Sequence, residues 1–273
     1  MKPPATLWKL RSRALDEARQ ALKRGSAEGL HDLRVALRRI AATATALGKR
    51  GTARRATALA RHLSPPRQLE VDRQLLARVA RLGLLSPDAV TALAARWEKL
   101  AERTGRRVAR ASDGKKMQRL RRRLERLARR DSGKGIGRLR TARREAEAGL
   151  ARSLESKDDK TLHRYRLEVK RARYLADDLV VLGFPENDDA EREKALQESL
   201  GRWNDLKTFR RRLAESREEA ERRGTVVLAG ELERLLKALE PAVTSARAAA
   251  ILASRQSAPA RVVPLRRAAQ ARA

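Results

Sequence analysis

The chain has 273 residues, no cysteine, and 65 Lys and Arg against 34 Asp and Glu, a formal net charge of +31. This length suits one large domain or two small ones, and the absence of cysteine excludes disulfides and thiolate metal ligands. So large a positive charge favours a polyanionic partner, for which nucleic acid, polyphosphate and an anionic membrane surface are the candidates.

The amino-terminal segment MKPPATLWKLRSRALDEARQ lacks the apolar run of a signal peptide. No window of the chain approaches the ~18 uninterrupted apolar residues of a membrane-spanning helix. The sequence therefore predicts a cytoplasmic protein with no membrane partner.

The composition favours an all-α fold, because Ala, Leu, Arg and Glu dominate and aromatic residues make up only 3%. Glycine, proline and Asp-Ser-Gly stretches separate segments with helical periodicity. The predicted helices are 6–24, 27–48, 52–63, 67–82, 87–110, 115–130, 135–156, 160–183, 188–201, 205–224 and 226–253. The last residues, 254–273, contain two prolines and scattered arginines, which predict a mobile basic tail.

An internal repeat is visible when LHDLRVALRR (30–39) is set over LHRYRLEVKR (162–171). A second match places 63–70 over 200–207 after an adjustment of five residues. The sequence thus predicts one domain of two repeats, about 5–130 and about 135–253, packed as pseudo-symmetric antiparallel helical bundles. The identical pairs in the first match are Leu30/Leu162, His31/His163, Arg34/Arg166 and Arg39/Arg171.

Both matched segments carry a basic stripe beside their apolar face. At about 100° per residue, the second segment groups His163, Arg166, Lys170, Arg173 and Tyr174. The first segment groups His31, Arg34 and Arg38 in the same way. Basic side chains whose stems pack on a core are held in place, so two such stripes predict a fixed cationic groove or pore.

Two ordinary interpretations stay open for these stripes. A basic helical face is often only a solvated surface, and His31 or His163 could be core histidines bonded to backbone carbonyls. Among so many cations the pKa of these imidazoles should fall unless an anion is bound. The third histidine, His62, lies outside the repeat and is interpreted as structural.

The segments LHDLRVALRR (30–39) and LHRYRLEVKRARY (162–174) resemble the two signature helices of the CHAD domain, the conserved histidine α-helical domain. LQESLGRWNDL (196–206) resembles the turn motif of its second half, and LSPPRQLEV (63–71) a degraded first-half counterpart. The resemblance covers about 5–253 and implies two related helical bundles around a basic surface or pore. It also implies binding of inorganic polyphosphate and residence at polyphosphate granules.

By motif position, the resemblance implies a set of polyphosphate ligands. Two departures weaken the first half: Ala41 stands where the second half has Arg173, and Gln68 where it has Asp205. The implied ligands are His31, Arg34, Arg38, Arg39, His163, Arg166, Lys170, Arg171 and Arg173, with Tyr174 beside them.

The sequence leaves several functions to compare. Polyphosphate has no bases to stack, so a rigid lining of Arg, Lys and His suits it. The predicted function is therefore polyphosphate binding without catalysis, and it needs no cofactor or metal.

Sequence-nonspecific nucleic-acid binding is the main alternative, although no paired aromatic platform is visible. A phosphoanhydride-processing enzyme is a weaker alternative. The acidic clusters at 158–159 and 186–193 suit helix capping better than metal binding, and the sequence contains no Walker A loop. A membrane-surface role is weaker still, because the apolar faces are expected to form a core.

Overall fold

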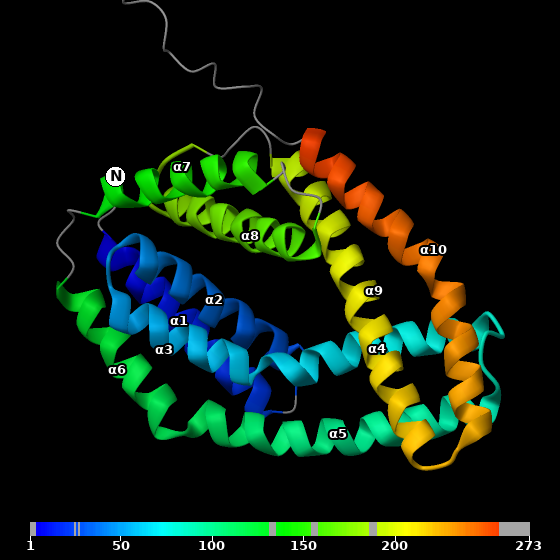
Figure 1. Ribbon diagram of the computed structural model, residues 1–273. Helices are drawn as coiled ribbons and strands as arrows, with labels where there is room; N and C mark the ends of the chain where they lie inside the picture. Colours follow the sequence, from blue (N-terminus) through cyan, green and yellow to red (C-terminus); the bar gives the residue numbers. More distant parts are fainter. Residues whose placement is uncertain are drawn as a thin grey trace, which may run out of the picture.

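The computed structural model of the chain describes residues 4–24, 26, 28–130, 135–153, 158–185 and 190–256, which form ten helices and no strand (Figure 1). This part of the chain confirms the predicted all-α fold. The helices are α1 (Pro4–Lys23), α2 (Gly29–Ala46), α3 (Arg50–His62), α4 (Ser64–Arg81), α5 (Pro87–Asp113), α6 (Lys115–Arg130), α7 (Ile136–Ser153), α8 (Asp159–Val181), α9 (Ala190–Arg222) and α10 (Val226–Gln256).

The predicted tail over 254–273 begins inside α10, which continues to Gln256. The side chain of Ser254 is buried there, and its backbone carbonyl accepts a hydrogen bond from the Tyr165 hydroxyl at 3.4 Å. The remainder of the predicted tail lies outside the described residues.

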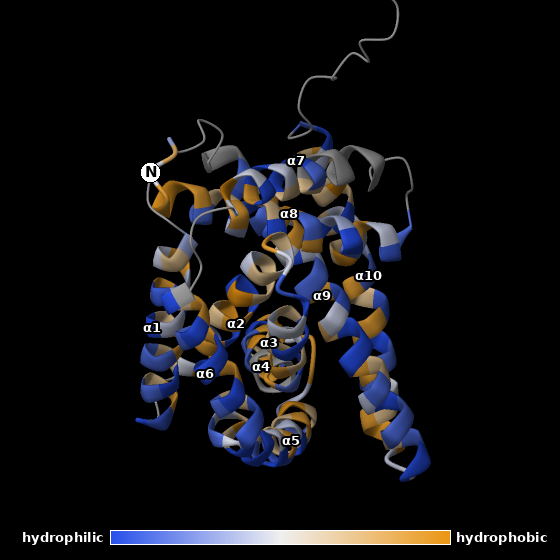
Figure 2. Ribbon diagram, turned by 90° about the vertical axis from the view of Figure 1, so that its left-hand side faces the viewer, coloured by the Kyte–Doolittle hydropathy of each residue, from blue (hydrophilic) through white to orange (hydrophobic). Residues whose placement is uncertain are grey.

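Three hydrophobic clusters hold the helices together. The first joins α1, α2, α3 and α6 to the C-terminal part of α8, with Trp8 and Leu175 fully buried. The second joins α4, α5, α9 and α10, where Trp97 and Phe209 meet edge to face at 6.0 Å. The third joins α8, α9 and α10 around Tyr165 and Trp203. Figure 2 shows hydrophilic and hydrophobic residues side by side along the same helices, as expected for amphipathic helices.

The clusters do not follow the two predicted repeats. Helix α8 from the second half completes the core of α1–α3, while α4 and α5 from the first half pack with α9 and α10. The single helix α9 lies in the second half where the first half has α3 and α4 in succession. The internal repeat therefore stays a prediction from the sequence.

The predicted break between 201 and 205 is wrong, because α9 runs without interruption from Ala190 to Arg222. Leu200 and Trp203 are almost fully buried on this helix. Burial of two large side chains outweighs the ~1 kcal/mol that a glycine such as Gly201 costs inside a helix. The segment LQESLGRWNDL is thus helix interior and not a turn.

The predicted break at 64–66 is confirmed. Helix α3 ends at His62, and α4 begins at Ser64 with prolines in its first turn, where the missing N–H groups need no partner. The predicted breaks near Gly48 and Gly183 are also confirmed, since both residues have positive φ values of 70° and 93°.

A buried polar link joins α1, α2 and α8. Asp178 is fully buried, pairs with the nearly buried guanidinium of Arg11, and accepts a hydrogen bond from the Thr43 hydroxyl at 2.5 Å. Burial raises the pKa of Asp178, and the contacts with Arg11 and Thr43 act against that rise. The link fixes α8 against α2.

Replacing Arg11 with Met should lower the free energy of unfolding by about 3–5 kcal/mol, because it leaves Asp178 buried without its cation. Urea denaturation followed by circular dichroism measures the loss. The control is Asp177→Ala, which removes the neighbouring, partly exposed partner of Arg39 and should cost less than ~1 kcal/mol. Equal losses for the two variants would contradict this account of the link.

Candidate anion-binding site

Helices α2 and α8 lie side by side (Figure 1), and two polar contacts set their relative position. Arg39 of α2 pairs with Asp177 of α8 at 2.8 Å, and Thr43 of α2 bonds to Asp178. The matched basic stripes of the two helices are therefore brought close to one another.

Five of the predicted ligands influence one another electrostatically, and we call them the basic cluster. Arg34, Arg38 and Arg166 all act to lower the pKa of Lys170. Arg38 also acts on Arg166, and both arginines act on His163. The structure thus brings together Arg34 and Arg38 of α2 with His163, Arg166 and Lys170 of α8.

Lys170 is the most perturbed member of the basic cluster. Burial, followed by the charges of Arg166 and Arg38, lowers its pKa from 10.5 to about 7. Among the described residues, no hydrogen bond or ion pair reaches the Lys170 ammonium. A half-buried ammonium beside arginines is unfavourable unless an anion compensates it.

Arg166 shares this environment. It is half-buried, its Nε atom is buried without a hydrogen-bond partner, and burial lowers the pKa of its guanidinium. Asp205 of α9 acts in the opposite direction on the pKa values of both Arg166 and Lys170. One carboxylate faces several cations here, so the cluster keeps a surplus of positive charge.

His163 lies near the start of α8. Loss of water contact and the charge of Arg166 lower its pKa, with smaller effects from Lys207 and Arg38. A hydrogen bond with the Asn204 side chain acts in the opposite direction. The predicted fall in the pKa of this histidine is confirmed in direction.

Three of the other predicted ligands already have partners within the protein. Arg39 pairs with Asp177 and lies over the ring of Tyr174, 5.5 Å from its centroid. Tyr174 borders the basic cluster, because it also affects the pKa of Arg166. Arg173 is exposed, and its Nη1 donates to the side-chain Oε1 of Gln197 at 2.9 Å.

Arg171 lies apart from these contacts, and His31 lies near the start of α2. Arg171 approaches Glu168 at 3.5 Å and lines a separate pocket of about 910 Å³ beside α3 and α7. One residue along a helix is a rotation of about 100°, so Arg171 and Lys170 face different neighbours. His31 is exposed in the first turn of α2.

Helix α9 supplies Asn204 and Asp205 from the segment expected to form a turn motif, and Lys207 from the predicted helix 205–224. Asn204 bonds to His163, and Asp205 acts on Arg166 and Lys170. Lys207 pairs with Asp159 at 2.7 Å and lies over the ring of Trp203. The motif LQESLGRWNDL contained the signal, but only a continuous helix brings these polar side chains to α8.

Within the described ranges, no cluster of three or more His, Asp or Glu residues is placed to hold a metal ion. The same residues contain no helix that is both long and apolar enough to cross a bilayer.

The Lys170 ammonium should titrate with a midpoint near 7 in the ligand-free protein. Asp205→Asn should lower that midpoint further, because the carboxylate stabilises the charged amine, and Arg38→Ala should raise it. NMR of ¹³C-methylated lysines follows the titration, and Lys170→Arg assigns the resonance by removing it. A wild-type midpoint near 10.5 would refute the description of this site.

Comparison with known proteins gives the same family. The sequence model of the CHAD domain matches residues 5–214, whereas a search of curated protein sequences gives no match. The fold is similar to PptA from Streptomyces chartreusis, with a TM-score of 0.74 and 18% identity over 92% of this chain and 97% of that one. It is also similar to the CHAD domain from the plant Ricinus communis, with a TM-score of 0.63 and 21% identity over 89% of this chain and 91% of that one. The family match spans most of the sequence, and the chain therefore belongs to the CHAD domain family.

Proposed function

We propose that the protein binds inorganic polyphosphate without turnover through the basic cluster on α2 and α8, and that this binding places it at polyphosphate granules in the cytoplasm. The observation that carries the proposal is Lys170, a half-buried amine among arginines whose pKa falls to about 7. A phosphate chain would supply the negative charge that these side chains lack. Membership of the CHAD family supports the same ligand.

The chemistry of the cluster suits phosphate oxygens. Each guanidinium offers a planar fork of donors, and the Lys170 ammonium adds a compact charge. Because these groups are partly removed from water, a bound anion interacts with them more strongly than it would with exposed side chains. Burial and mutual repulsion together lower the pKa values of Lys170 and Arg166, and a bound anion relieves the repulsion.

Nucleic acid is the main competing ligand. Binding of single strands usually relies on aromatic side chains on which bases stack. Five of the seven aromatic residues of the chain are buried in the hydrophobic clusters, and Tyr174 and Phe184 each have an arginine over the ring. This arrangement favours a polyanion without bases, and nucleic acid is expected to bind weakly and without sequence preference.

Binding without turnover is supported by the surroundings of His163. Its contact is with an amide, Asn204, and not with a carboxylate that would strengthen it as a base. The neighbouring arginine and lysine charges lower its pKa further. The surroundings of His163 therefore favour binding over base catalysis by this residue, and release of orthophosphate during a binding titration would contradict this part of the proposal.

The variant His163→Ala/Arg166→Ala/Lys170→Ala should weaken binding of long-chain polyphosphate by well over about tenfold, because it removes the charges that face the polymer. Its helicity should stay intact. Isothermal titration calorimetry at two salt concentrations measures the affinity, and circular dichroism checks the fold.

The matched control is Lys160→Ala/Arg164→Ala, which removes two permanent charges from exposed positions on the same helix. It should change the affinity less than about twofold at physiological salt, where exposed charges are screened. Equal losses in the triple variant and in this control would indicate diffuse attraction and refute the proposed site.

Binding should be linked to proton uptake above pH 7. Lys170 has a pKa of about 7 without ligand, and a bound polyanion raises it. Below pH 7 the amine is protonated in both states and contributes no pH dependence. Above pH 7 the free protein must gain a proton to bind, so affinity should fall by up to about tenfold per pH unit.

Calorimetry in buffers of different ionisation enthalpy counts the protons taken up. Lys170→Arg keeps the positive charge at all these pH values, so it should bind and lose the uptake. Unchanged proton uptake in Lys170→Arg would show that another group is responsible.

A further inference from the structure

A second basic pocket lies between α3, α5 and the start of α6, and it shares no residue with the basic cluster. Its volume is about 600 Å³, and its wall contains apolar atoms of Leu59 and Ala111. His62, interpreted from the sequence as structural, is exposed at this pocket. The basic residues that line it are Arg61, His62, Arg107, Arg110, Lys115 and Lys116.

The pocket differs from the other described pockets in its lack of acidic residues. Each of the other four has at least one carboxylate in its lining. In the pocket beside α10, for example, Arg210 pairs with Glu240 at 2.5 Å and Lys207 with Asp159 at 2.7 Å. In the α3–α5–α6 pocket, none of the six basic side chains forms a hydrogen bond or ion pair with any described residue.

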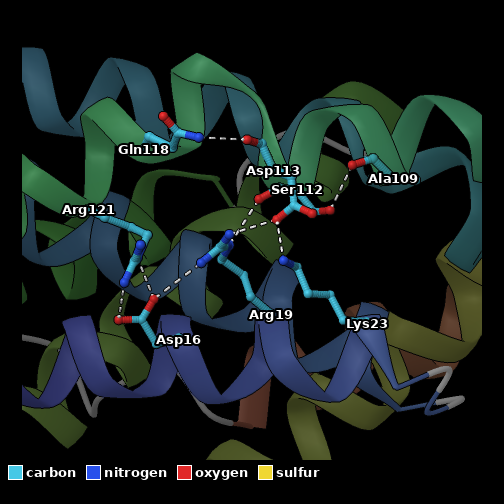
Figure 3. Close-up of polar contacts among 8 residues, drawn as sticks. All are labelled: Asp16, Arg19, Lys23, Ala109, Ser112, Asp113, Gln118 and Arg121. Carbon is cyan, nitrogen blue, oxygen red and sulfur yellow. Dashed lines mark hydrogen bonds and ion pairs between the residues drawn. The ribbon is translucent and has the colours of Figure 1, made fainter.

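Asp113 is the acidic residue that lies nearest in the sequence to the pocket residues of α5 and α6, and its carboxylate contacts side chains of α1 (Figure 3). Arg19 is buried and contacts Asp113 Oδ1 at 2.7 Å, while its Nε donates to the Ser112 carbonyl at 2.9 Å. Lys23 approaches the same carboxylate at 3.1 Å, and the hydrogen bond with Lys23 is the main reason that the pKa of Asp113 is lowered. The charge of Asp113 is therefore neutralised by α1, at the corner where α5 ends and α6 begins.

Contacts with α1 also fix the positions of α5 and α6 at this pocket. Arg121 of α6 binds both carboxylate oxygens of Asp16 on α1, at 2.5 and 3.1 Å (Figure 3). Together with the Arg19 contacts, this pair holds the C-terminal end of α5 and the N-terminal half of α6 against α1. Gly114, Lys115 and Lys116 are thus presented to the pocket by a rigid corner.

The start of α6 adds to the positive potential. Its first turn contains no acidic residue and carries two lysines at the positive end of the helix dipole. Lysines at this end are unfavourable for the helix alone, and an anion would reverse their effect. The helix dipole and six cations from three helices therefore favour the same kind of ligand.

We propose that the α3–α5–α6 pocket is a second binding site for a phosphate anion, and that it takes a short segment of a phosphate polymer. The assignment of a phosphate polymer rests on the proposed function, whereas the site itself rests on residues that the proposed function does not use. The protein would then hold such polymers at two separate places.

The three histidines of the chain provide local reporters for a test. His62 lies in the pocket, and His163 lies in the basic cluster. Imidazole ¹H–¹⁵N NMR spectra are recorded on the full chain during titration with tripolyphosphate. We expect saturable shifts of both the His62 and the His163 signals, and the His62 shifts should persist in the His163→Ala/Arg166→Ala/Lys170→Ala variant.

The pocket variant is Arg61→Ala/Arg107→Ala/Lys115→Ala, with one exposed charge removed from each helix. Its matched control, Arg55→Ala/Arg106→Ala/Arg122→Ala, removes the same charge from exposed positions of the same three helices outside the pocket. The affinity reported by His62 should fall about tenfold or more in the pocket variant and less than about twofold in the control.

The outcomes separate the two proposals. His163 shifts without His62 shifts would overturn the second site and leave the proposed function standing. His62 shifts without His163 shifts would overturn the proposed function of the basic cluster and leave the second site standing. Equal losses in pocket variant and control, or a stronger His62 response to a DNA duplex at the same phosphate concentration, would overturn the assignment of this pocket to a phosphate polymer.

Discussion

The main constraint on this structure is the positive charge that neighbouring carboxylates do not neutralise where α2 meets α8. Among the described residues, the buried arginines Arg11 and Arg19 pair with the carboxylates of Asp178 and Asp113. Arg166 and Lys170 have no such ion pair among the described residues; Asp205 favours their charged forms, and neighbouring arginines oppose it. Since unpaired charges are costly away from water, a protein that keeps them together gains most when a polyanion binds.

The fold keeps these charges together by surrounding them with firmly packed helices. Helix α8 is anchored at its C-terminal part in the core of α1–α3 and at its N-terminal part against α9 and α10. The buried Asp178 link prevents α8 from sliding along α2, and the uninterrupted helix α9 brings Asn204 and Asp205 to the cluster. Packing thus holds cations at positions that their mutual repulsion would otherwise separate.

Much of this arrangement could be predicted from the sequence, because helix formers and glycine or proline breaks locate most helices. The aligned His-Arg patterns identified Arg34, Arg38, His163, Arg166 and Lys170, which the structure brings together. The role of Asn204 was hidden because Gly201 and Asn204 suggested a turn, and only tertiary burial of Trp203 keeps that segment helical. The position of Arg171 beside another pocket depends on which helices pack on each side of α8, and helical periodicity alone does not contain that information.

A structure of the protein in complex with tripolyphosphate would show whether the basic cluster on α2 and α8 holds the phosphate chain. We expect phosphate oxygens within hydrogen-bonding distance of Arg166 and Lys170 of α8 and of Arg34 or Arg38 of α2, with the helices in the same positions as in the ligand-free protein. A complex in which tripolyphosphate is bound elsewhere while these four side chains remain without an anion would contradict this expectation.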